Sequence, residues 1–197
     1  MQVVLATANA GKQRELAALL APLNIELLLQ STLGIGAIEE TGTSFEANAL
    51  LKARHAAASS GLAALADDSG LEVDALGGRP GVYSARYARA GASDAENNAR
   101  LISELGQVGD AQRSARYRCV LVLVRSAADP APLVAQGSWE GHIARQAAGT
   151  GGFGYDPWFI PLGFSCTVAQ LPAEQKNKLS HRAQALRQLT AELGKWP

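Results

Sequence analysis

Acidic side chains that could bind a metal ion occur at two places in the chain. Glu39 and Glu40 form one pair, and Asp67 and Asp68 directly follow the apolar run 62–66. Mg²⁺ takes oxygen ligands and keeps several of its waters, so one or two carboxylates beside a substrate phosphate are enough to hold it. Because two adjacent side chains cannot both point into a core, we expect at least one aspartate to face a cleft. The composition Asp-Asp-Ser-Gly also favours a plain turn, and taken alone that interpretation is the stronger one.

A phosphate site is predicted near the N-terminus. The apolar run 3–6 predicts a strand, and leucines recur at helical spacing over 16–23. The residues between them are Thr7, Ala8, Asn9, Ala10, Gly11 and Lys12. A helix that begins here presents backbone N–H groups at its positive end, and Lys12 adds a charge, so a phosphate would bind well. An ordinary capped helix with solvated Lys12 and Glu15 is an equally weighted alternative.

A glycine-rich loop at 149–154 carries aromatic residues and an aspartate: Phe153, Gly154, Tyr155 and Asp156. Its glycines match the dinucleotide fingerprint, but that motif must open a helix, and Pro157 disfavours a helix at Asp156. Aromatic rings stack on bases and a carboxylate accepts from a base N–H, which makes the loop a candidate nucleobase pocket. A core aromatic cluster beside a surface loop is the competing interpretation, at even weight.

A group of basic residues precedes the C-terminus: Lys176, Lys178, His181 and Arg182. We expect them at the start of the final helix, where positive charge opposes the helix dipole and an anionic ligand would relieve the conflict. The three histidines of the chain show no metal-ligand spacing.

These candidates need a scaffold of strands alternating with helices. Helices are predicted after a Thr43–Glu46 capping box to about Ser59, after a Ser93–Glu96 capping box to 105, and after Ser180 to Gly194. Strands are predicted over 3–6, 25–29, 62–66, 71–76, 114–124, 134–139 and 142–146, with turns at 67–70 and 140–141. The opening βαβ-like unit together with later hairpins predicts an α/β fold with a mixed sheet.

Composition limits the function classes. The 197 residues suit one compact domain, and 18 basic residues balance 18 acidic ones. A protein that coats a nucleic-acid polymer needs a basic excess, so that class is disfavoured. Two cysteines suit a reducing compartment, and no apolar run reaches the roughly 18 residues that span a bilayer. The N-terminus lacks the basic flank and apolar stretch of a signal peptide, and we expect a cytoplasmic protein without a membrane partner.

Taken in order, the motifs resemble the inosine triphosphate pyrophosphatase family, in particular its bacterial dITP/XTP pyrophosphatase branch. The motifs are Thr-Ala-Asn-Ala-Gly-Lys at 7–12 with Glu15, Glu-Thr-Gly at 40–42, Asn-Ala at 48–49 with Lys-Ala at 52–53, Asp-Asp-Ser-Gly-Leu at 67–71, Pro-Gly-Val-Tyr-Ser-Ala-Arg-Tyr at 80–87, Gly-Thr-Gly-Gly-Phe-Gly-Tyr-Asp-Pro at 149–157, and Ser-His-Arg at 180–182. They cover nearly the whole chain.

The resemblance implies Mg²⁺-dependent hydrolysis of ITP, dITP or XTP to the monophosphate and pyrophosphate. Asp68 aligns with the proton acceptor, and Glu40 and Asp68 with the metal-binding carboxylates. The substrate contacts align with Thr7 to Lys12, Ser69, Lys176, His181 and Arg182, and the base contacts with Phe153 to Asp156. Lys52 is a further candidate for balancing phosphate charge, and Glu15 and Asp67 are candidates for supporting roles.

The resemblance also implies a fold and an assembly. It implies one domain over 1–197, with a long, mixed, twisted sheet and flanking helices in two lobes around a central cleft, and a homodimer. Two other functions remain open: a Maf-like pyrophosphatase of other modified nucleotides, and a non-catalytic nucleotide-binding module. Pyrophosphate release from ITP that stops when metal is chelated distinguishes an enzyme of this kind from the binding module.

Overall fold

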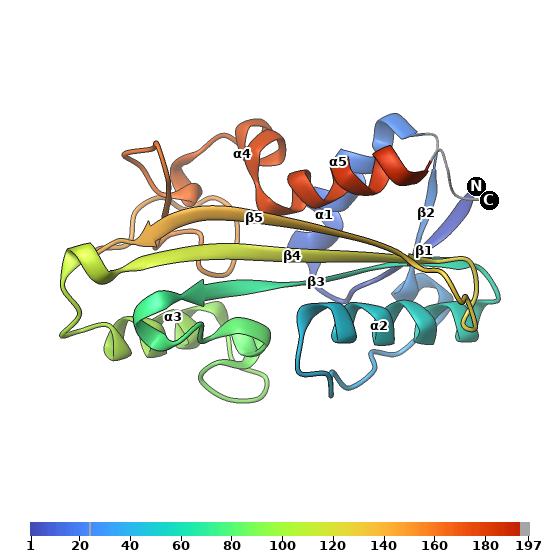
Figure 1. Ribbon diagram of the computed structural model, residues 1–197, viewed down its shortest axis with the longest axis horizontal. Coiled ribbons are helices and arrows are strands. Elements are labelled where there is room, and N and C mark those ends of the chain that lie inside the picture. The colour runs from blue at the N-terminus through green and yellow to red at the C-terminus, as the bar shows by residue number, and fades with distance from the viewer. Residues whose placement is uncertain (24, 194–197) are drawn as a thin grey trace. The chain divides into compact units, whose positions relative to one another are not determined.

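A computed structural model describes residues 1–23 and 25–193, and its main element is a six-stranded sheet (Figure 1). The strands are β1 (Gln2–Ala6), β2 (Glu26–Leu29), β3 (Ala63–Val73), β4 (Ser114–Val124), β5 (Leu133–Ile143) and β6 (Phe159–Pro161), in the order β2-β1-β3-β4-β5-β6. β1 is parallel to β2 and β3, whereas β5 and β6 are antiparallel. The predicted α/β class with a mixed sheet is therefore confirmed.

Five α-helices are formed by the described residues: α1 (Ala10–Leu20), α2 (Phe45–Ser60), α3 (Asp94–Glu104), α4 (Ala173–Leu179) and α5 (His181–Leu193). The chain divides into two compact units. Unit 1 contains residues 1–68, 119–137 and 182–197, and unit 2 contains 69–118 and 138–181. Each unit has its own core. Gly194, the predicted end of the last helix, lies outside the described residues.

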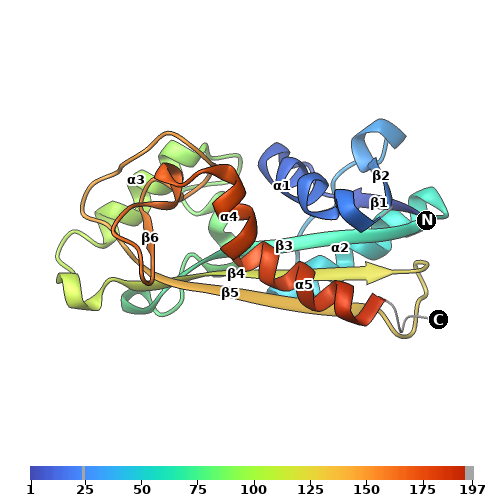
Figure 2. The ribbon, with the colours of Figure 1, turned by 90° about the horizontal axis from the view of Figure 1, so that it is seen from above.

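In unit 1, helices cover both faces of the strands. α1 and α5 lie on one face and α2 on the other (Figure 1), and α5 runs in front of β4 and β5 in Figure 2. The core beneath α1 and α5 is built from leucines of both helices and alternate residues of the strands, including Leu5, Leu65 and Leu121. Alternation along a strand sends the next residues to the opposite face.

The other face of unit 1 packs against the alanine-rich helix α2. Ala49, Ala53 and Ala56 of this helix are fully buried, as are Val4 and Ala64 of the strands. Small side chains on both surfaces let the helix lie close to the sheet. Because the sequence of α2 is only weakly amphipathic, the burial of this face is what stabilises the helix.

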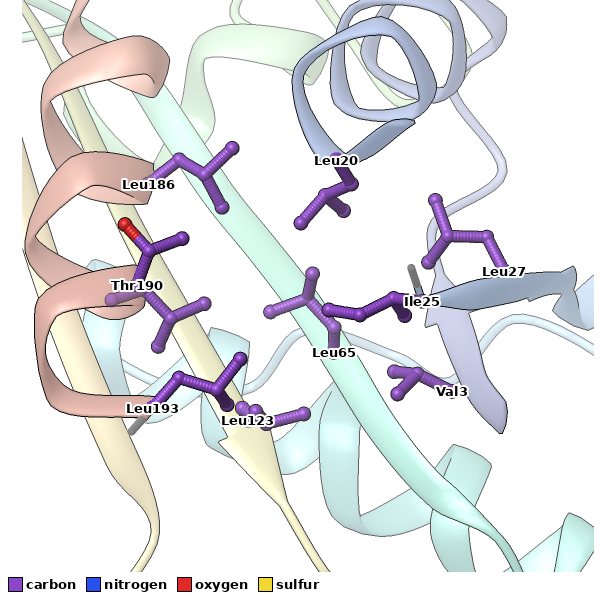
Figure 3. Close-up of a pocket in the computed structure, with 10 residues that line it drawn as sticks. Val3, Leu20, Ile25, Leu27, Leu65, Leu123, Leu186, Thr190 and Leu193 are labelled. Carbon is purple, nitrogen blue, oxygen red and sulfur yellow. The ribbon is translucent and has the colours of Figure 1, made fainter. Parts of the chain in front are cut away.

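A small cavity remains in the core of unit 1 (Figure 3). Its volume is about 10 Å³, close to the minimum for a single water. The lining comes from the strands and from α1 and α5: Val3, Leu20, Ile25, Leu27, Leu65, Leu123, Leu186, Leu189, Thr190 and Leu193. Because all but Thr190 are apolar, this cavity is a packing gap and not a ligand site.

Unit 2 has a separate core beneath α3. Leu101 and Leu105 at the end of that helix pack with Leu71 and Val73 of β3 and with Phe159 of β6. The ring of Phe159 also contacts Tyr117 and Trp139, with centroids 4.6 and 6.2 Å away. This core supports the long loop between β5 and β6.

Two predicted turns are wrong, because each lies inside a continuous strand. β3 runs through Asp67, Asp68 and Gly70, and β5 runs through Gly141. Both glycines are sites of close approach: a Cβ at Gly70 would lie 2.5 Å from the Gly81 carbonyl oxygen, and one at Gly141 would lie 2.2 Å from that of Ile160. Tertiary packing overrides the turn composition at both places.

The helix starts are partly as predicted. Ser93 and Glu96 form the expected capping box on α3, whereas α2 is capped by Ser44, whose hydroxyl accepts from the Ala47 N–H, and not by Thr43. Within 1–23 and 25–193, no helix has the length and apolar character needed to span a membrane.

Candidate functional site

The predicted strand-loop-helix unit at the N-terminus is confirmed. β1 ends at Ala6, and Asn9 caps α1 by accepting from the Lys12 N–H at 3.0 Å. Thr7 is buried, and its hydroxyl and carbonyl oxygens accept from the Asn9 N–H and the Gln13 side chain. Ala8, Asn9 and Ala10 are exposed. The loop is therefore held by hydrogen bonds of Thr7 and Asn9, while residues 8–10 are exposed at the start of the helix.

Asp67 is a buried anchor for two cations of unit 1. Its side chain is 0% exposed; Oδ1 lies 2.6 Å from Lys12 Nζ, and Oδ2 lies 2.7 Å from Arg182 Nε. Arg182 also pairs with Glu15. Burial alone would raise the pKa of the Asp67 carboxyl, but Arg182 and Lys12 hold it well below its usual range. Asp67 is thus ionised and fixes both cationic groups.

Asp68 lies in a second charge cluster with Lys52 and Glu40. Lys52 Nζ, from α2, is 2.7 Å from Glu40 Oε1, 2.7 Å from Asp68 Oδ1 and 2.8 Å from the Asp67 carbonyl oxygen. Asp68 Oδ2 is buried and has no hydrogen-bond partner among the residues that the structure describes. Burial raises the pKa of Asp68, opposed by Lys52. Burial would lower the pKa of Lys52, but Asp68 and Glu40 outweigh it and raise that pKa.

The two aspartates have different partners because they are successive residues of one strand. Side chains alternate along β3, so Asp67 shares the face of Leu65, toward α1 and α5, and Asp68 shares the face of Ala66, toward α2. Both residues are buried, at 0% and 5% exposed, on opposite faces of the sheet, and the expectation that at least one of them faces a cleft stays a prediction. Each carboxylate is buried beside a cation on its own side of the sheet.

In unit 2, Asp156 organises the glycine-rich loop. Its carboxylate accepts from Lys176 Nζ at 2.5 Å, from the Phe153 N–H at 2.9 Å and from the Tyr117 hydroxyl at 3.1 Å. Lys176 Nζ also lies 4.6 Å from the centre of the Phe153 ring. A carboxylate has about four acceptor positions, so Asp156 is largely used within the protein. Lys176, which only donates, is the better candidate for recognising a base oxygen.

Two residues of α3 hold the same loop by its backbone. The Gly154 N–H donates to Asp94 Oδ2 at 2.6 Å, and Asn98 Nδ2 donates to the Gly154 carbonyl oxygen at 2.9 Å. Gly154 has a φ of 62°, which favours glycine. Tyr155 is buried, and its hydroxyl donates to the Ser84 carbonyl oxygen. The loop is therefore fixed on both sides of Phe153.

The basic group near the C-terminus is not one cluster. Lys176 lies in the last turn of α4, and α5 begins only at His181. Lys176 pairs with Asp156 in unit 2, and Arg182 pairs with Asp67 in unit 1. The His181 ring stacks on Tyr117 at 4.7 Å. The expected clash with the dipole of the final helix is thus wrong for Lys176, since cations at a helix C-terminus are favourable.

Nearly the whole chain is similar to proteins of one known family. The model of the Ham1 family matches residues 3–192. The chain belongs to the Ham1 family. It is 54% identical to the dITP/XTP pyrophosphatase of Photorhabdus laumondii and 56% identical to that of Shigella flexneri, in each case over 95% of both chains. The family resemblance inferred from the sequence motifs is confirmed.

Solved structures of Ham1 proteins share the fold. The HAM1 protein of Coxiella burnetii matches all of this Ham1 chain with a TM-score of 0.91 and 46% identity. The Staphylococcus aureus Ham1 protein matches 99% of each chain with a TM-score of 0.85 and 37% identity. A dITP/XTP pyrophosphatase of Mycobacterium abscessus matches 96% of this chain with a TM-score of 0.77 and 42% identity.

Several residues that contact the candidate site residues within each unit were not singled out from the sequence: Cys119 in unit 1, and Asp94, Asn98, Tyr117 and Ser84, which lies in the motif at 80–87, in unit 2. Cys119 donates from its thiol to Asp67 at 3.3 Å, and burial raises the pKa of that thiol well above its usual value. The Ser93–Glu96 capping box predicted the start of α3, and the position of Asp94 in the first turn of that helix was the signal that could have identified it. The others act through partners far along the chain, which no local pattern reveals.

Proposed function

We propose that this Ham1-family chain hydrolyses nucleoside triphosphates with non-canonical purines, of the dITP/ITP and XTP type, to the monophosphate and pyrophosphate. The observation that carries the proposal is Asp68, whose Oδ2 is buried without a hydrogen-bond partner in the described structure, beside Glu40 and Lys52. The names of the relatives, which match over nearly their full length, support the substrate class.

The donor set fits a magnesium ion. Glu40 and Asp68 are the carboxylates that would hold it, and their oxygens already lie together beside Lys52 Nζ. In the part of the chain that the structure describes, no group of three or more histidine, cysteine or acidic residues forms a metal site. That suits Mg²⁺, which needs few protein ligands when phosphate and water complete its shell. When bound, the ion would supply charge neutralisation and polarisation of the phosphoanhydride.

Charge counting in unit 1 supports a metal requirement for substrate binding. Lys12, Lys52 and Arg182 are in contact with four carboxylates, those of Glu15, Glu40, Asp67 and Asp68. In these contacts the charges of the Asp67 cluster balance, and the Asp68 cluster of Lys52, Glu40 and Asp68 has one negative charge in excess when both carboxylates are ionised. A triphosphate carries about four negative charges near neutral pH, so its binding here needs added positive charge. We propose that metal removal weakens nucleotide binding as well as turnover.

The proposed mechanism gives each group of residues one role. In unit 1, the exposed loop from Ala8 to Ala10 and the side chains of Lys12, Lys52 and Arg182 bind the phosphates. Asp68 Oδ2 accepts the proton of the attacking water, and its raised pKa suits a base. In unit 2, Phe153 to Asp156, Lys176 and His181 serve the base. Asp67 and Glu15 act as supports.

We also propose one domain over 1–197, a homodimer in solution and a cytoplasmic location. The zero net charge argues against a nucleic-acid polymer as partner. Both cysteines are free, as expected in a reducing compartment. Light scattering coupled to gel filtration measures the oligomeric state, and a mass of 20.6 kDa would contradict the homodimer.

The test of function is pyrophosphate release from ITP. Incubation with Mg²⁺ should give inosine monophosphate and pyrophosphate, and chelation with EDTA should stop the reaction. Release of orthophosphate alone would contradict cleavage between the α and β phosphorus atoms. Binding of ITP without any turnover would favour the non-catalytic module, and preference for a modified pyrimidine nucleotide would favour the Maf-like alternative.

A further inference from the structure

Asn48 is a buried residue of α2 for which the proposed reaction has no role. Its side chain is 0% exposed, and Oδ1 accepts from the Gly42 N–H at 2.8 Å. Its Nδ2 is buried and has no hydrogen-bond partner among residues 1–23 and 25–193. A buried polar side chain costs stability unless it is satisfied, so a half-satisfied asparagine indicates a role beyond packing.

The partner of Asn48 lies in the segment that carries Glu40. Gly42 is two residues after Glu40, and its backbone lies directly on the start of α2. A Cβ at Gly42 would lie 2.6 Å from Asn48 Oδ1 and 2.8 Å from Ala47 Cβ, which no side chain tolerates without movement. Only glycine lets the backbone approach this closely.

The segment 40–42 is thus hydrogen-bonded to α2 at both of its ends. Gly42 is bound by Asn48, and Glu40 is bound by Lys52, one helical turn further along the same side of the helix. The two attachments differ in kind. Lys52 Nζ bridges Glu40 and Asp68, so its position overlaps the carboxylate pair that a cation would occupy. A cation held by Glu40 and Asp68 would compete with the Lys52 contact, whereas the Asn48–Gly42 hydrogen bond does not involve either carboxylate.

We propose that Asn48 is a positioning residue for the metal site: by holding Gly42 it keeps Glu40 opposite Asp68 when the Lys52 bridge is exchanged for a cation. The proposal rests on the proposed function, in that Glu40 and Asp68 are taken as the metal carboxylates. Partners of metal ligands commonly change metal affinity about 10- to 100-fold when removed.

The test is a Mn²⁺ titration of the full chain without nucleotide, followed by electron paramagnetic resonance. We expect Asn48→Ala to weaken Mn²⁺ binding about tenfold. Glu40→Gln should weaken it as well, and adding Asn48→Ala to Glu40→Gln should cause little further loss, because Asn48 acts through Glu40. Unchanged affinity in Asn48→Ala, or a full tenfold loss on the Glu40→Gln background, would overturn the proposal.

Asn97 of α3 provides a matched control. It is also a buried helix asparagine whose Oδ1 accepts a backbone N–H of a preceding loop, that of Ala88 at 2.9 Å. Asn97→Ala should lower the Tm but leave Mn²⁺ affinity unchanged. If Asn48→Ala does not fold, Gly42→Ala separates the same loop from the helix and should weaken Mn²⁺ binding, and wild-type affinity there would equally overturn the proposal.

The experiment separates failure of the two proposals. If Glu40→Gln leaves Mn²⁺ binding unchanged, the assignment of the metal carboxylates is wrong, and the premise of the Asn48 proposal is lost with it. If Glu40→Gln weakens binding and Asn48→Ala does not, the metal site stands and only the role of Asn48 is wrong.

Discussion

The ammonium nitrogen of Lys52 lies 2.7 Å from Oδ1 of Asp68, which leaves Oδ2 as the buried oxygen of Asp68 without a protein partner in the described structure. One oxygen is therefore neutralised by a cation, while the other can accept a proton. The two oxygens of Asp68 therefore differ in their capacity to accept a proton.

Asp68→Asn should lower kcat for ITP by about 10²- to 10⁴-fold, because an amide cannot accept the proton of the attacking water. At saturating Mg²⁺ most of the substrate affinity should remain, since Lys12 and Arg182, the proposed phosphate contacts, are held by Asp67 and not by Asp68. Steady-state kinetics and isothermal titration calorimetry measure the two quantities. Near-normal turnover in this variant would remove Asp68 from the mechanism.

The base should be selected by the group at its 6-position. Lys176 of α4 is buried against Asp156 of the glycine-rich loop and can only donate, so it suits a 6-oxo oxygen and opposes the 6-amino group of adenine. An unmatched buried group costs roughly 1–3 kcal/mol, so kcat/KM for ITP should exceed that for ATP by about 5- to 150-fold. Equal values for the two nucleotides, measured at one Mg²⁺ concentration, would contradict base selection by this loop.

The two hydrogen bonds that Asp94 and Asn98 make with the Gly154 backbone should be needed for tight binding of the base. Replacing Asp94 and Asn98 by alanine removes the hydrogen bonds on both sides of Gly154, each worth about 1 kcal/mol, and should raise KM for ITP about tenfold or more. Inhibition by pyrophosphate should stay unchanged, because pyrophosphate has no base. Arg100→Ala, on the exposed part of the same helix, is the control. A wild-type KM in the double variant would show that the loop holds its position without α3.

A pH-dependent contribution to stability is expected from Asp129. Its buried carboxylate accepts from the Arg125 side chain and backbone and from the Ala131 N–H, and Arg125 holds the pKa of Asp129 below its usual value. A lowered folded-state pKa gives stability that is present above the unfolded-state value of about 3.9 and is lost as the pH falls through the folded-state pKa.

Asp129→Asn should therefore cost about 1.5–3 kcal/mol of unfolding free energy at pH 7, and the difference from wild type should shrink below about pH 4. Urea unfolding at several pH values measures this difference. Asp110→Asn is the control, because its side chain is 79% exposed and its ion pair with Arg145 should contribute little. A cost that is constant down to pH 3 would contradict an electrostatic origin.

The sequence predicted those parts of the fold that depend on local chemistry. The βαβ unit, the long strand 114–124 and the Ser93–Glu96 capping box follow from periodicity and from the hydrogen-bonding needs of a helix end, and all three are confirmed. The loop before α1 was located because a strand that ends in small residues before a helical pattern leaves few other structures available, and phosphate binding at 7–12 stays a prediction.

The charge partners could not be predicted, because they join residues far apart in the chain. Asp67 and Arg182 are 115 residues apart, and the turn-like composition at 67–70 concealed a strand. Local propensity favours a turn there, but the burial of Asp67 and Asp68 in ion pairs on opposite faces of the strand outweighs it. The role of Asn98 was likewise hidden, since its partner is 56 residues away.

The alternation along β3 makes this strand intolerant of changes in length. Insertion or deletion of one residue between Ala64 and Asp67 would reverse which face each aspartate takes, so that the anchor of Lys12 and Arg182 would face Lys52 and Asp68, the proposed proton acceptor, would face α1. Surface loops absorb such changes at little cost. We therefore expect length variation among functional variants of this chain to be confined to the connections and absent from the first half of β3.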